Sequence, residues 1–405
     1  MSVRYESSSS DASPLGKPLT FEFSGKTARN RFLKGAMSER QASWDPNDFE
    51  SRGIPSTNLY DHLEAMGNPI IPLDAPTEGL RFERFAAMAK AGKAHGSLMV
   101  AQVNHPGRQV ENRVQQNPIS ASDVQLEGAP IGLSYNKPRP ATQEDIDSII
   151  DKFAHAAEYL EKAGFDGIQL HGAHGYLLAQ FLSKTTNKRT DKYGGSLENR
   201  FRIIKEISEE IRKRVKPDFI LGIKMNSVEF QEDGFTPEDA KAACQELEGA
   251  KFDYVELSGG TYQKTAFVHQ RESTRKRENF FLEFAEEIVK PLMKTKAYVT
   301  VDGVGLGRPA AQEFRLPKDI LEGRVTGAKK IPVDENEFLL TNIAAGTQMK
   351  QVGNDEEPVD LSIAGNVELF RKEMAAWAAK RAADKEFKEY GFINWTHDVR
   401  PYGEY

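Results

Sequence analysis

The chain has 405 residues, of which 39% are hydrophobic and 28% are charged, and its formal net charge is −6. This composition predicts a soluble globular protein, and its acidity gives no electrostatic basis for binding nucleic acid or an anionic membrane. The single cysteine, Cys244, excludes an internal disulfide, an iron–sulfur cluster held by four thiolates and a cysteine-based zinc site. We therefore expect a protein of a reducing compartment, with the cytoplasm as its default location.

The first 16 residues are rich in serine and contain no apolar segment. This predicts a disordered tail for residues 1–16 and excludes a signal peptide there. No later apolar run approaches the roughly 20 residues that a transmembrane helix requires, so no membrane partner is expected.

From residue 30 onward the predicted elements alternate between strands and helices. In chain order they are a strand at 30–38, a helix at 80–94, a strand at 97–103, a helix at 142–164, a strand at 167–170, a helix at 197–215, a strand at 219–225, a helix at 236–248, a strand at 252–257, a helix at 280–293 and a strand at 297–301. This alternation implies a parallel sheet, and the number of repeats favours a (β/α)8 TIM-type barrel over an open doubly wound sheet. Residues 41–78 contain no convincing strand.

The barrel prediction divides the chain into three parts. After the tail, residues 17–345 would form the barrel and residues 346–405 a C-terminal helical extension. The helix predicted at 366–385 could pack on the barrel exterior or on a second subunit of a homo-oligomer.

Three side chains that can donate hydrogen bonds follow the strand at 167–170, namely His171, His174 and Tyr176. Such groups just past a strand end of a barrel indicate a polar catalytic pocket. The histidines could instead be satisfied within a loop, or could bind a metal, although no third ligand of a suitable type lies nearby in the sequence. The long connection at 117–140, with its scattered proline and glycine, is typical of an active-site lid.

The last predicted strand continues into a glycine-rich segment that contains Gly307 and Arg308. Glycine lets backbone N–H groups approach an anion, and arginine can bind the anion through two hydrogen bonds. A tight turn would explain the same glycines equally well. The position after the last strand of a barrel nevertheless favours a phosphate site.

Several longer motifs can be read together. They are HGAHGYLLAQFLSKTTNKRTDKYGGSLENR at 171–200, AQVNHPGRQ at 101–109, YVELSGGTY at 254–262, RESTRKRE at 271–278 and GLGRP at 305–309. Together they resemble the Old Yellow Enzyme family of FMN-dependent NAD(P)H:flavin oxidoreductases, especially its fungal members. The resemblance extends over most of residues 17–360. It implies an FMN-binding barrel that takes electrons from NAD(P)H and reduces the C=C bond of a small α,β-unsaturated carbonyl compound.

Family roles can be transferred residue by residue. His171 and His174 resemble the pair that binds the substrate's carbonyl oxygen, and Tyr176 resembles the proton donor to Cα while flavin N5 delivers a hydride to Cβ. Gln102 would read the pyrimidine edge of the flavin, and Lys224 would stabilise the negative charge of its reduced form. The residues that the resemblance places around FMN are Ala36, Met37, Ser38, Gln102, His171, Lys224, Gly307 and Arg308.

Two internal blocks of the family are missing. Family members carry a long stretch with the second barrel strand between the equivalents of Tyr60 and Asp61, which are adjacent here. At residues 298–305 the chain lacks the usual loop and helix between the seventh and eighth strands. Because neighbouring parallel strands need a crossover of about a dozen residues, we expect that this segment cannot form both strands in the usual order. Both flanks keep the family register, which favours a truncated transcript or mis-assigned introns; a source cDNA that matches this chain would contradict that hypothesis.

Three functions are therefore open. The first is an FMN-dependent ene-reductase that works by ping-pong chemistry. The second is a truncated or mis-spliced family member with impaired FMN binding and little or no activity, because the barrel cannot close. The third is a different phosphate-binding barrel, such as an aldolase or an isomerase. An aldolase would need a Schiff-base lysine, for which Lys224 is the candidate.

Overall fold

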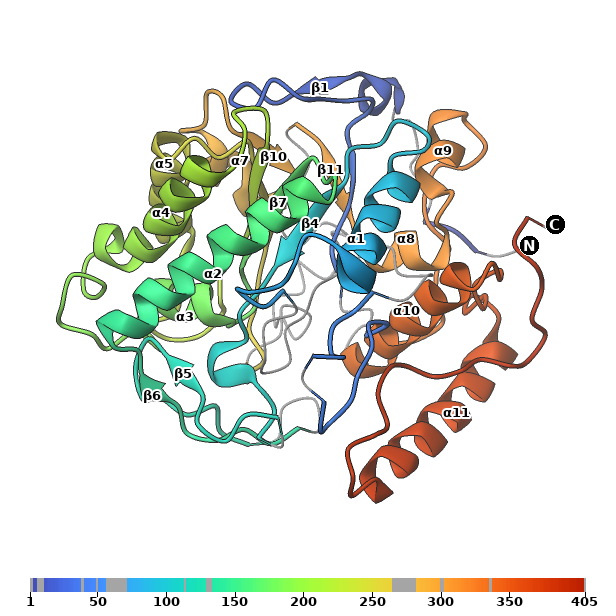
Figure 1. The fold of residues 1–405 in the computed structure, drawn as a ribbon. Helices are drawn as coiled ribbons and strands as arrows, with labels where there is room; N and C mark the ends of the chain where they lie inside the picture. The colour runs from blue at the N-terminus through green and yellow to red at the C-terminus, as the bar shows by residue number, and fades with distance from the viewer. Residues whose placement is uncertain are drawn as a thin grey trace.

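The computed structural model describes residues 3–5, 11–37, 40–48, 50–55, 71–112, 114–128, 133–263, 282–298, 302–334 and 337–403. Its largest sheet has five parallel strands in the order β10-β9-β8-β7-β4. These strands are β4 (Val100–Val103), β7 (Gly167–Gly172), β8 (Ile220–Asn226), β9 (Tyr254–Ser258) and β10 (Lys296–Tyr298). The helices that alternate with them are α1 (Gly79–Gly92), α2 (Gln143–Lys162), α4 (Leu197–Arg214), α5 (Pro237–Gly249) and α7 (Leu282–Val289). Figure 1 shows α2, α4 and α5 side by side on the outside of this sheet.

Local sequence signals fix where two of these helices begin. The Thr142 hydroxyl accepts a hydrogen bond from the Asp145 N–H, and the Asp145 carboxylate accepts one from the Thr142 N–H. Thr236 and Asp239 make the same reciprocal pair ahead of α5, where Pro237 is the first helical residue. Each cap satisfies backbone donors that the first helical turn leaves unpaired, and typically contributes about 1 kcal/mol.

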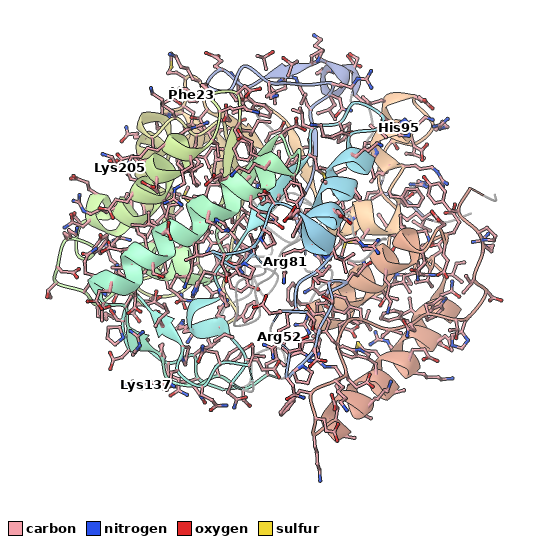
Figure 2. The ribbon with its side chains drawn as sticks, in the orientation of Figure 1. Phe23, Arg52, Arg81, His95, Lys137 and Lys205 are labelled. Carbon is pink, nitrogen blue, oxygen red and sulfur yellow. The ribbon has the colours of Figure 1, made fainter. Side chains whose placement is uncertain are left out.

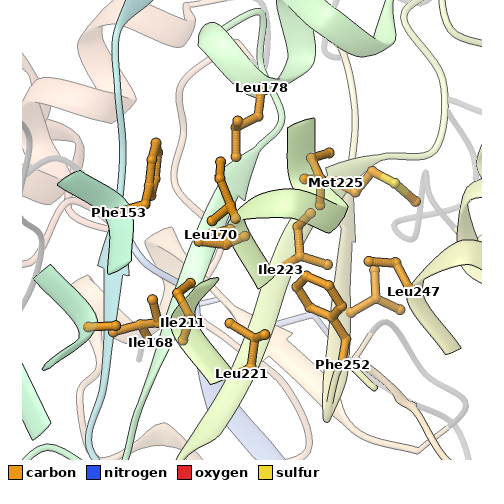
Figure 3. Packing of buried hydrophobic residues seen from close by; sticks show 14 of the residues in the cluster. Phe153, Ile168, Leu170, Leu178, Ile211, Leu221, Ile223, Met225, Leu247 and Phe252 are labelled. Carbon is orange, nitrogen blue, oxygen red and sulfur yellow. The ribbon is translucent and has the colours of Figure 1, made fainter. Parts of the chain in front are cut away.

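The strand sequences alternate between the outer and inner face of the sheet. On β7, Ile168 and Leu170 are fully buried against the helices, whereas Gln169 and His171 occupy the alternate positions, which face the interior. Figure 3 shows the outer packing, where Phe153 of α2, Ile211 of α4 and Leu247 of α5 join the apolar residues of β7 and β8. Burying one such side chain contributes about 1.5–3 kcal/mol, so this layer supplies most of the stability.

A second, smaller apolar cluster closes the amino-terminal end of the strands. Phe21 follows the first strand of a short antiparallel hairpin, and its ring centroid lies 5.7 Å from that of Tyr254 and 6.4 Å from that of Tyr298. The hairpin consists of β1 (Leu19–Thr20) and β2 (Thr27–Ala28). Apolar side chains therefore fill this end of the sheet, and the buried polar residues His171, Lys224 and Glu256 lie further along the strands.

Two further strands form a separate parallel pair, β3 (Phe32–Lys34) and β11 (Val304–Leu306). Among the described residues, β3 pairs with no other strand, so no pairing links it to β4. A single bridge between Tyr298 and Gly303 links β10 to the start of β11. In the part of the chain that the structure describes, the barrel is therefore not closed, which agrees with the predicted α/β, (β/α)8-type but incomplete fold. The junction of Tyr60 and Asp61 lies outside the described residues.

The second junction agrees with the prediction. Both β10 and β11 form, but they belong to separate sheets, and one bridge between Tyr298 and Gly303 is the link between them among the described residues. Because Gly303 lies level with Tyr298, β11 begins at the height where β10 ends. The two strands are therefore not the side-by-side neighbours that a crossover of the usual length would allow.

The C-terminal region packs around its own apolar cluster, which contains Ile343, Phe370 and Trp395. Its helices, coloured orange to red in Figure 1, are α8 (Arg308–Gln312), α9 (Leu316–Leu321), α10 (Phe338–Gly353) and α11 (Ala364–Ala383). The helix predicted at 366–385 is α11, which packs on α10. The predicted boundary at residue 345 falls inside α10, because one continuous helix crosses it.

Segment 40–55 connects α1 to this C-terminal region. Arg81 of α1 donates hydrogen bonds to the backbone oxygens of residues 50 and 52, at 2.7 and 2.8 Å (Figure 2). The Arg52 guanidinium lies 4.3 Å from the Trp44 ring centroid, and the Trp44 indole N–H donates to the Phe387 carbonyl oxygen at 2.7 Å. Trp44 also stacks on Tyr390.

The remaining short elements lie in the tail and in the loops. They are the 3-10 turns η1 (Ser13–Gly16) and η2 (Gly107–Gln109), the parallel pair β5 (Ile119–Ser120) and β6 (Arg139–Pro140), and helix α3 (Leu177–Leu182). Within residues 1–16, for which a disordered tail was predicted, Arg4 forms an ion pair with Glu313 at 2.7 Å. Within the described ranges, no helix has both the length and the apolar character to cross a membrane.

Candidate functional site

The candidate site is built on adjacent strands whose inward residues lie at one level. In the sheet register, His171 of β7 is the partner of Lys224 of β8, which in turn is the partner of Glu256 of β9. All three side chains are nearly buried. Three polar groups at the carboxyl ends of parallel strands are the arrangement in which barrels of this type place their chemistry.

A tight turn after β7 brings the predicted rings together. His174 adopts a left-handed backbone conformation with φ of 58°, and Gly175 follows with φ of 78°. The His171 ring centroid then lies 5.2 Å from that of His174 and 4.7 Å from that of Tyr176. A non-glycine residue in this region is uncommon, and such residues cluster at functional sites.

The two imidazoles are held by specific partners. Nδ1 of His171 accepts the Ala173 N–H at 3.3 Å, so in the neutral ring the proton sits on Nε2, which becomes a donor. Nε2 of His174 lies 2.7 Å from the Ser258 hydroxyl oxygen, and the His174 N–H donates to Asn226. Removal from bulk water, and then the nearby Lys224 ammonium, lower the pKa of His174 to about 3. His174 is therefore a neutral hydrogen-bonding group at physiological pH.

Tyr176 is paired with a second tyrosine. Its hydroxyl oxygen lies 2.7 Å from that of Tyr262, and either oxygen can be the donor. Tyr176 is nearly buried while Tyr262 is only half-buried, so the pair leads from the pocket towards the surface. Residues 264–281, which follow this pair in the chain, lie outside the described residues.

A chain of polar side chains crosses the interior from β8 to β4. Lys224 Nζ lies 2.9 Å from Glu256 Oε1, and Gln169 Nε2 donates to Glu256 Oε2 at 2.9 Å. Gln102 Nε2 donates in turn to Gln169 Oε1 at 2.6 Å. The sequence predicted Lys224 and Gln102 but missed Gln169 and Glu256. Their alternate positions on β7 and β9, two residues from His171 and from Tyr254, were the signal that could have found them.

Gln102 meets the requirement for binding a flavin pyrimidine ring. Its Oε1 is buried and has no hydrogen-bond partner among the described residues. A buried acceptor without a partner costs free energy unless a ligand or water satisfies it, and the flavin pyrimidine carries a suitable N–H donor. The Gln102 oxygen is therefore an acceptor of the kind that the predicted flavin ring would need.

The predicted phosphate grip lies on the other strand pair. Arg308 begins α8, and its Nη1 donates to the Thr341 hydroxyl of α10 at 2.7 Å. A Cβ built on Gly307 would lie 3.6 Å from Met37 Sδ, so the predicted flavin loop and the predicted grip are neighbours. Ala36 is half-buried and belongs to the same loop as Met37. Ser38 lies outside the described residues.

The two groups of predicted residues meet through a glycine. A Cβ on Gly35 would lie only 3.1 Å from Glu256 Oε1, so glycine leaves the room that this carboxylate occupies. One group of predicted residues stands on the five-stranded sheet: His171, His174, Tyr176, Lys224 and Gln102. It approaches the other group where Glu256 lies beside Gly35, in the loop after β3. In the described part of the chain, no cluster of three histidine, cysteine or acidic side chains could hold a metal ion.

Comparison with known proteins gives the relatives of this chain. The NADH:flavin oxidoreductase / NADH oxidase family matches residues 80–314. The NADH-dependent flavin oxidoreductase nadA of Aspergillus parasiticus is 45% identical over 415 residues, covering 93% of this chain and 94% of the relative. The NADH oxidase of Thermoanaerobacter brockii is 34% identical over 264 residues, covering 61% and 40% of the two chains.

The fold has solved counterparts. The old yellow enzyme homologue of Zymomonas mobilis superposes with a TM-score of 0.59 at 23% identity, covering 78% of this chain and 94% of that chain. Morphinone reductase in complex with tetrahydroNAD also gives 0.59, at 22% identity, covering 78% and 92%. The family match and the Aspergillus relative, together with this fold, place the chain in the NADH:flavin oxidoreductase / NADH oxidase family, which includes the Old Yellow Enzymes: it is an FMN-dependent oxidoreductase that uses NAD(P)H as reductant.

Proposed function

We propose that the protein reduces the C=C bond of α,β-unsaturated carbonyl compounds, with His171 and His174 binding the carbonyl oxygen and Tyr176 supplying the proton. The observation that carries the proposal is the position of the His171 ring, whose centroid lies 5.2 Å from that of His174 and 4.7 Å from that of Tyr176. His171 is also level with Lys224 on the neighbouring strand. Bound FMN would supply the hydride after accepting it from NAD(P)H.

The histidines would act as neutral donors. His171 carries its proton on Nε2 when Nδ1 accepts the Ala173 N–H, and the low pKa of His174 keeps that ring uncharged. Hydrogen bonds to a carbonyl oxygen draw electron density away from the conjugated double bond, which favours hydride addition at Cβ. A buried neutral pair does this without the desolvation cost of two buried cations.

Tyr176 would complete the reaction by donating its hydroxyl proton to Cα. A phenol has an ordinary pKa of about 10 and stays protonated at neutral pH, so it can act as a general acid. The tyrosinate left behind would be stabilised by the Tyr262 hydroxyl, 2.7 Å away. The remaining predicted residues would hold the cofactor: Gln102 and Lys224 at the ring, and Arg308 at the phosphate.

The test separates the two half-reactions. We expect Tyr176→Phe to reduce its flavin with NADH at the wild-type rate and to reoxidise with cyclohexenone at least about 100-fold more slowly, because general acid catalysis is worth about 10²–10⁴. Stopped-flow absorbance of the flavin measures both rates. Tyr5→Phe is the control, since its half-buried ring lies beside Lys330 in the amino-terminal segment. An unchanged reoxidation rate in Tyr176→Phe would exclude Tyr176 as the proton donor.

A second candidate is a family member with impaired FMN binding. The observation that favours it is the open seam between β3 and β4 among the described residues. The alignment with the Aspergillus relative also spans 415 positions while 93% of the 405 residues of this chain take part, so the relative carries residues that this chain lacks. Reconstitution of the purified protein with FMN, followed by gel filtration, decides: a retained flavin spectrum supports the reductase, and its loss supports impaired binding.

A further inference from the structure

Glu256 is the centre of the polar chain inside the barrel. Its side chain extends from β9, and the residue is only 6% exposed. One carboxylate oxygen pairs with the Lys224 ammonium at 2.9 Å, and the other accepts the Gln169 amide at 2.9 Å. Gly35 of the other strand pair leaves room for the same carboxylate. Glu256 therefore contacts β7 and β8 and faces the loop after β3.

The ion pair is neutral as a whole. A buried ammonium without an acid nearby is costly, and a buried ion pair is tolerated when the remaining oxygen is also satisfied, as it is here by Gln169. The ammonium is thus held in one position, and most of its charge is compensated within 3 Å. A negative charge that forms beside Lys224 is therefore attracted by the ammonium and repelled by the Glu256 carboxylate, so the net stabilisation is smaller than a free cation would give.

The carboxylate also orders the amides that follow it. A carboxylate is only an acceptor, so Gln169 must turn its NH2 group towards Glu256 and its oxygen towards Gln102. Gln102 then uses its own NH2 group on Gln169, which leaves its buried oxygen without a partner among the described residues. The charge on Glu256 therefore determines that Gln102 presents an acceptor and not a donor.

We propose that Glu256 is a positioning residue that lowers the reduction potential of the bound flavin by compensating Lys224, and that it orients the Gln102 amide towards the flavin through Gln169. This inference rests on the flavin-binding roles given to Lys224 and Gln102 under the proposed function. A free cation beside the ring would stabilise the negative charge of the reduced flavin, and the paired cation does so less. The same carboxylate would improve FMN affinity by fixing the acceptor that meets the ring.

The experiment uses the full chain reconstituted with FMN. In Glu256→Gln we expect the reduced flavin to be favoured about tenfold, which corresponds to a potential about 30 mV more positive for a two-electron couple. Lys224→Met should shift the potential in the negative direction, and the double variant should lie between the two. Dye-coupled reduction measures the potential, and quenching of FMN fluorescence measures the affinity, which should weaken in Glu256→Gln.

Asp253→Asn is the matched control. Asp253 is a fully buried carboxylate at the amino end of the same strand, where it pairs with Arg212 at 3.2 Å and accepts the Leu221 N–H. Its loss should lower the melting temperature of the protein and leave the flavin potential unchanged. The control thereby separates a general loss of stability from an effect on the flavin.

Each outcome decides between the proposals. A potential that is unchanged or more negative in Glu256→Gln, with flavin bound to the wild type, overturns the role of Glu256 and leaves the reductase function standing. If Glu256→Gln does not fold, the comparison of Lys224→Met with the double variant replaces it, since removal of the acid must still raise the potential. A wild-type chain that binds no FMN overturns the proposed function and this inference together.

Discussion

The two sheets of the barrel differ in how firmly the chain builds them. Every residue of β7 and β8 is buried, and each of these strands has pairing partners on both sides and a helix layer outside. Strands β3 and β11 have three residues each, all of them half-buried or exposed. Among the residues that the structure describes, they pair only with one another and through one bridge. The proposed catalytic rings stand on the first sheet, and the proposed phosphate grip stands on the second. The five-stranded sheet therefore holds the proposed catalytic rings more firmly than the pair of β3 and β11 holds the proposed phosphate grip.

The largest expected effect tests the packing of the five-stranded sheet. A Cβ on Gly167 would lie 2.4 Å from the Ile220 backbone oxygen of the neighbouring strand, and the two strands cannot separate without losing their pairing. We expect Gly167→Ala to lower the free energy of unfolding by about 3 kcal/mol. Urea denaturation followed by circular dichroism measures the loss.

Gly305→Ala is the counterpart in the smaller sheet. The nearest atom to its Cβ would be Glu256 Oε1 at 3.5 Å, an ordinary contact, so we expect a change of less than about 1 kcal/mol. Equal effects of Gly167→Ala and Gly305→Ala would contradict the difference between the sheets.

The next largest effect concerns the proposed phosphate grip at Arg308. Arg308→Ala should weaken FMN binding about tenfold, because a charge-assisted hydrogen bond to the phosphate would be lost. Fluorescence quenching gives the affinity. Arg315→Ala is the control, since Arg315 pairs with Glu357 away from the strand ends. The same affinity in both variants would remove Arg308 from the proposed grip.

The smallest expected effect is a flat pH profile. Because the pKa of His174 lies near 3, its ring stays neutral from pH 5 to 8, and the reoxidation rate with cyclohexenone should show no step near pH 6.5 in that range. The free energy of unfolding, in contrast, should depend on pH. The histidine takes up its proton at a higher pH in the unfolded chain than in the folded one, so the contribution of His174 to stability is lost as pH falls from about 6.5 towards 3. A step near pH 6.5 that vanishes in His174→Asn would show that the histidine is charged during catalysis.

The sequence predicted the parts of the fold that carry strong periodic patterns. Helices α2 and α4 and strands β7 and β8 lie within a few residues of their predicted positions, because one face of each is apolar and their ends carry caps or turns. Helix α3 was missed because all six of its residues are buried, so it has no polar face to reveal its period. The rule on crossovers correctly predicted that β10 and β11 would not lie side by side, since the two strands belong to separate sheets.

The site was predicted where the side chains follow one another in the chain, as His171, His174 and Tyr176 do. Glu256 and Tyr262 could not be found in this way, since their roles come from contacts with residues 32 and 86 positions away in the chain. Such contacts depend on which strands become neighbours and in which register. The family assignments for Ala36, Met37, Ser38, Gly307 and Arg308 remain predictions.

The staggered start of β11 has a mechanical consequence. Because β11 begins level with the end of β10 and one bridge joins them among the described residues, few backbone hydrogen bonds hold the two sheets together at this seam. Side-chain contacts such as the one between Gly35 and Glu256 must therefore carry more of the link between the two sheets.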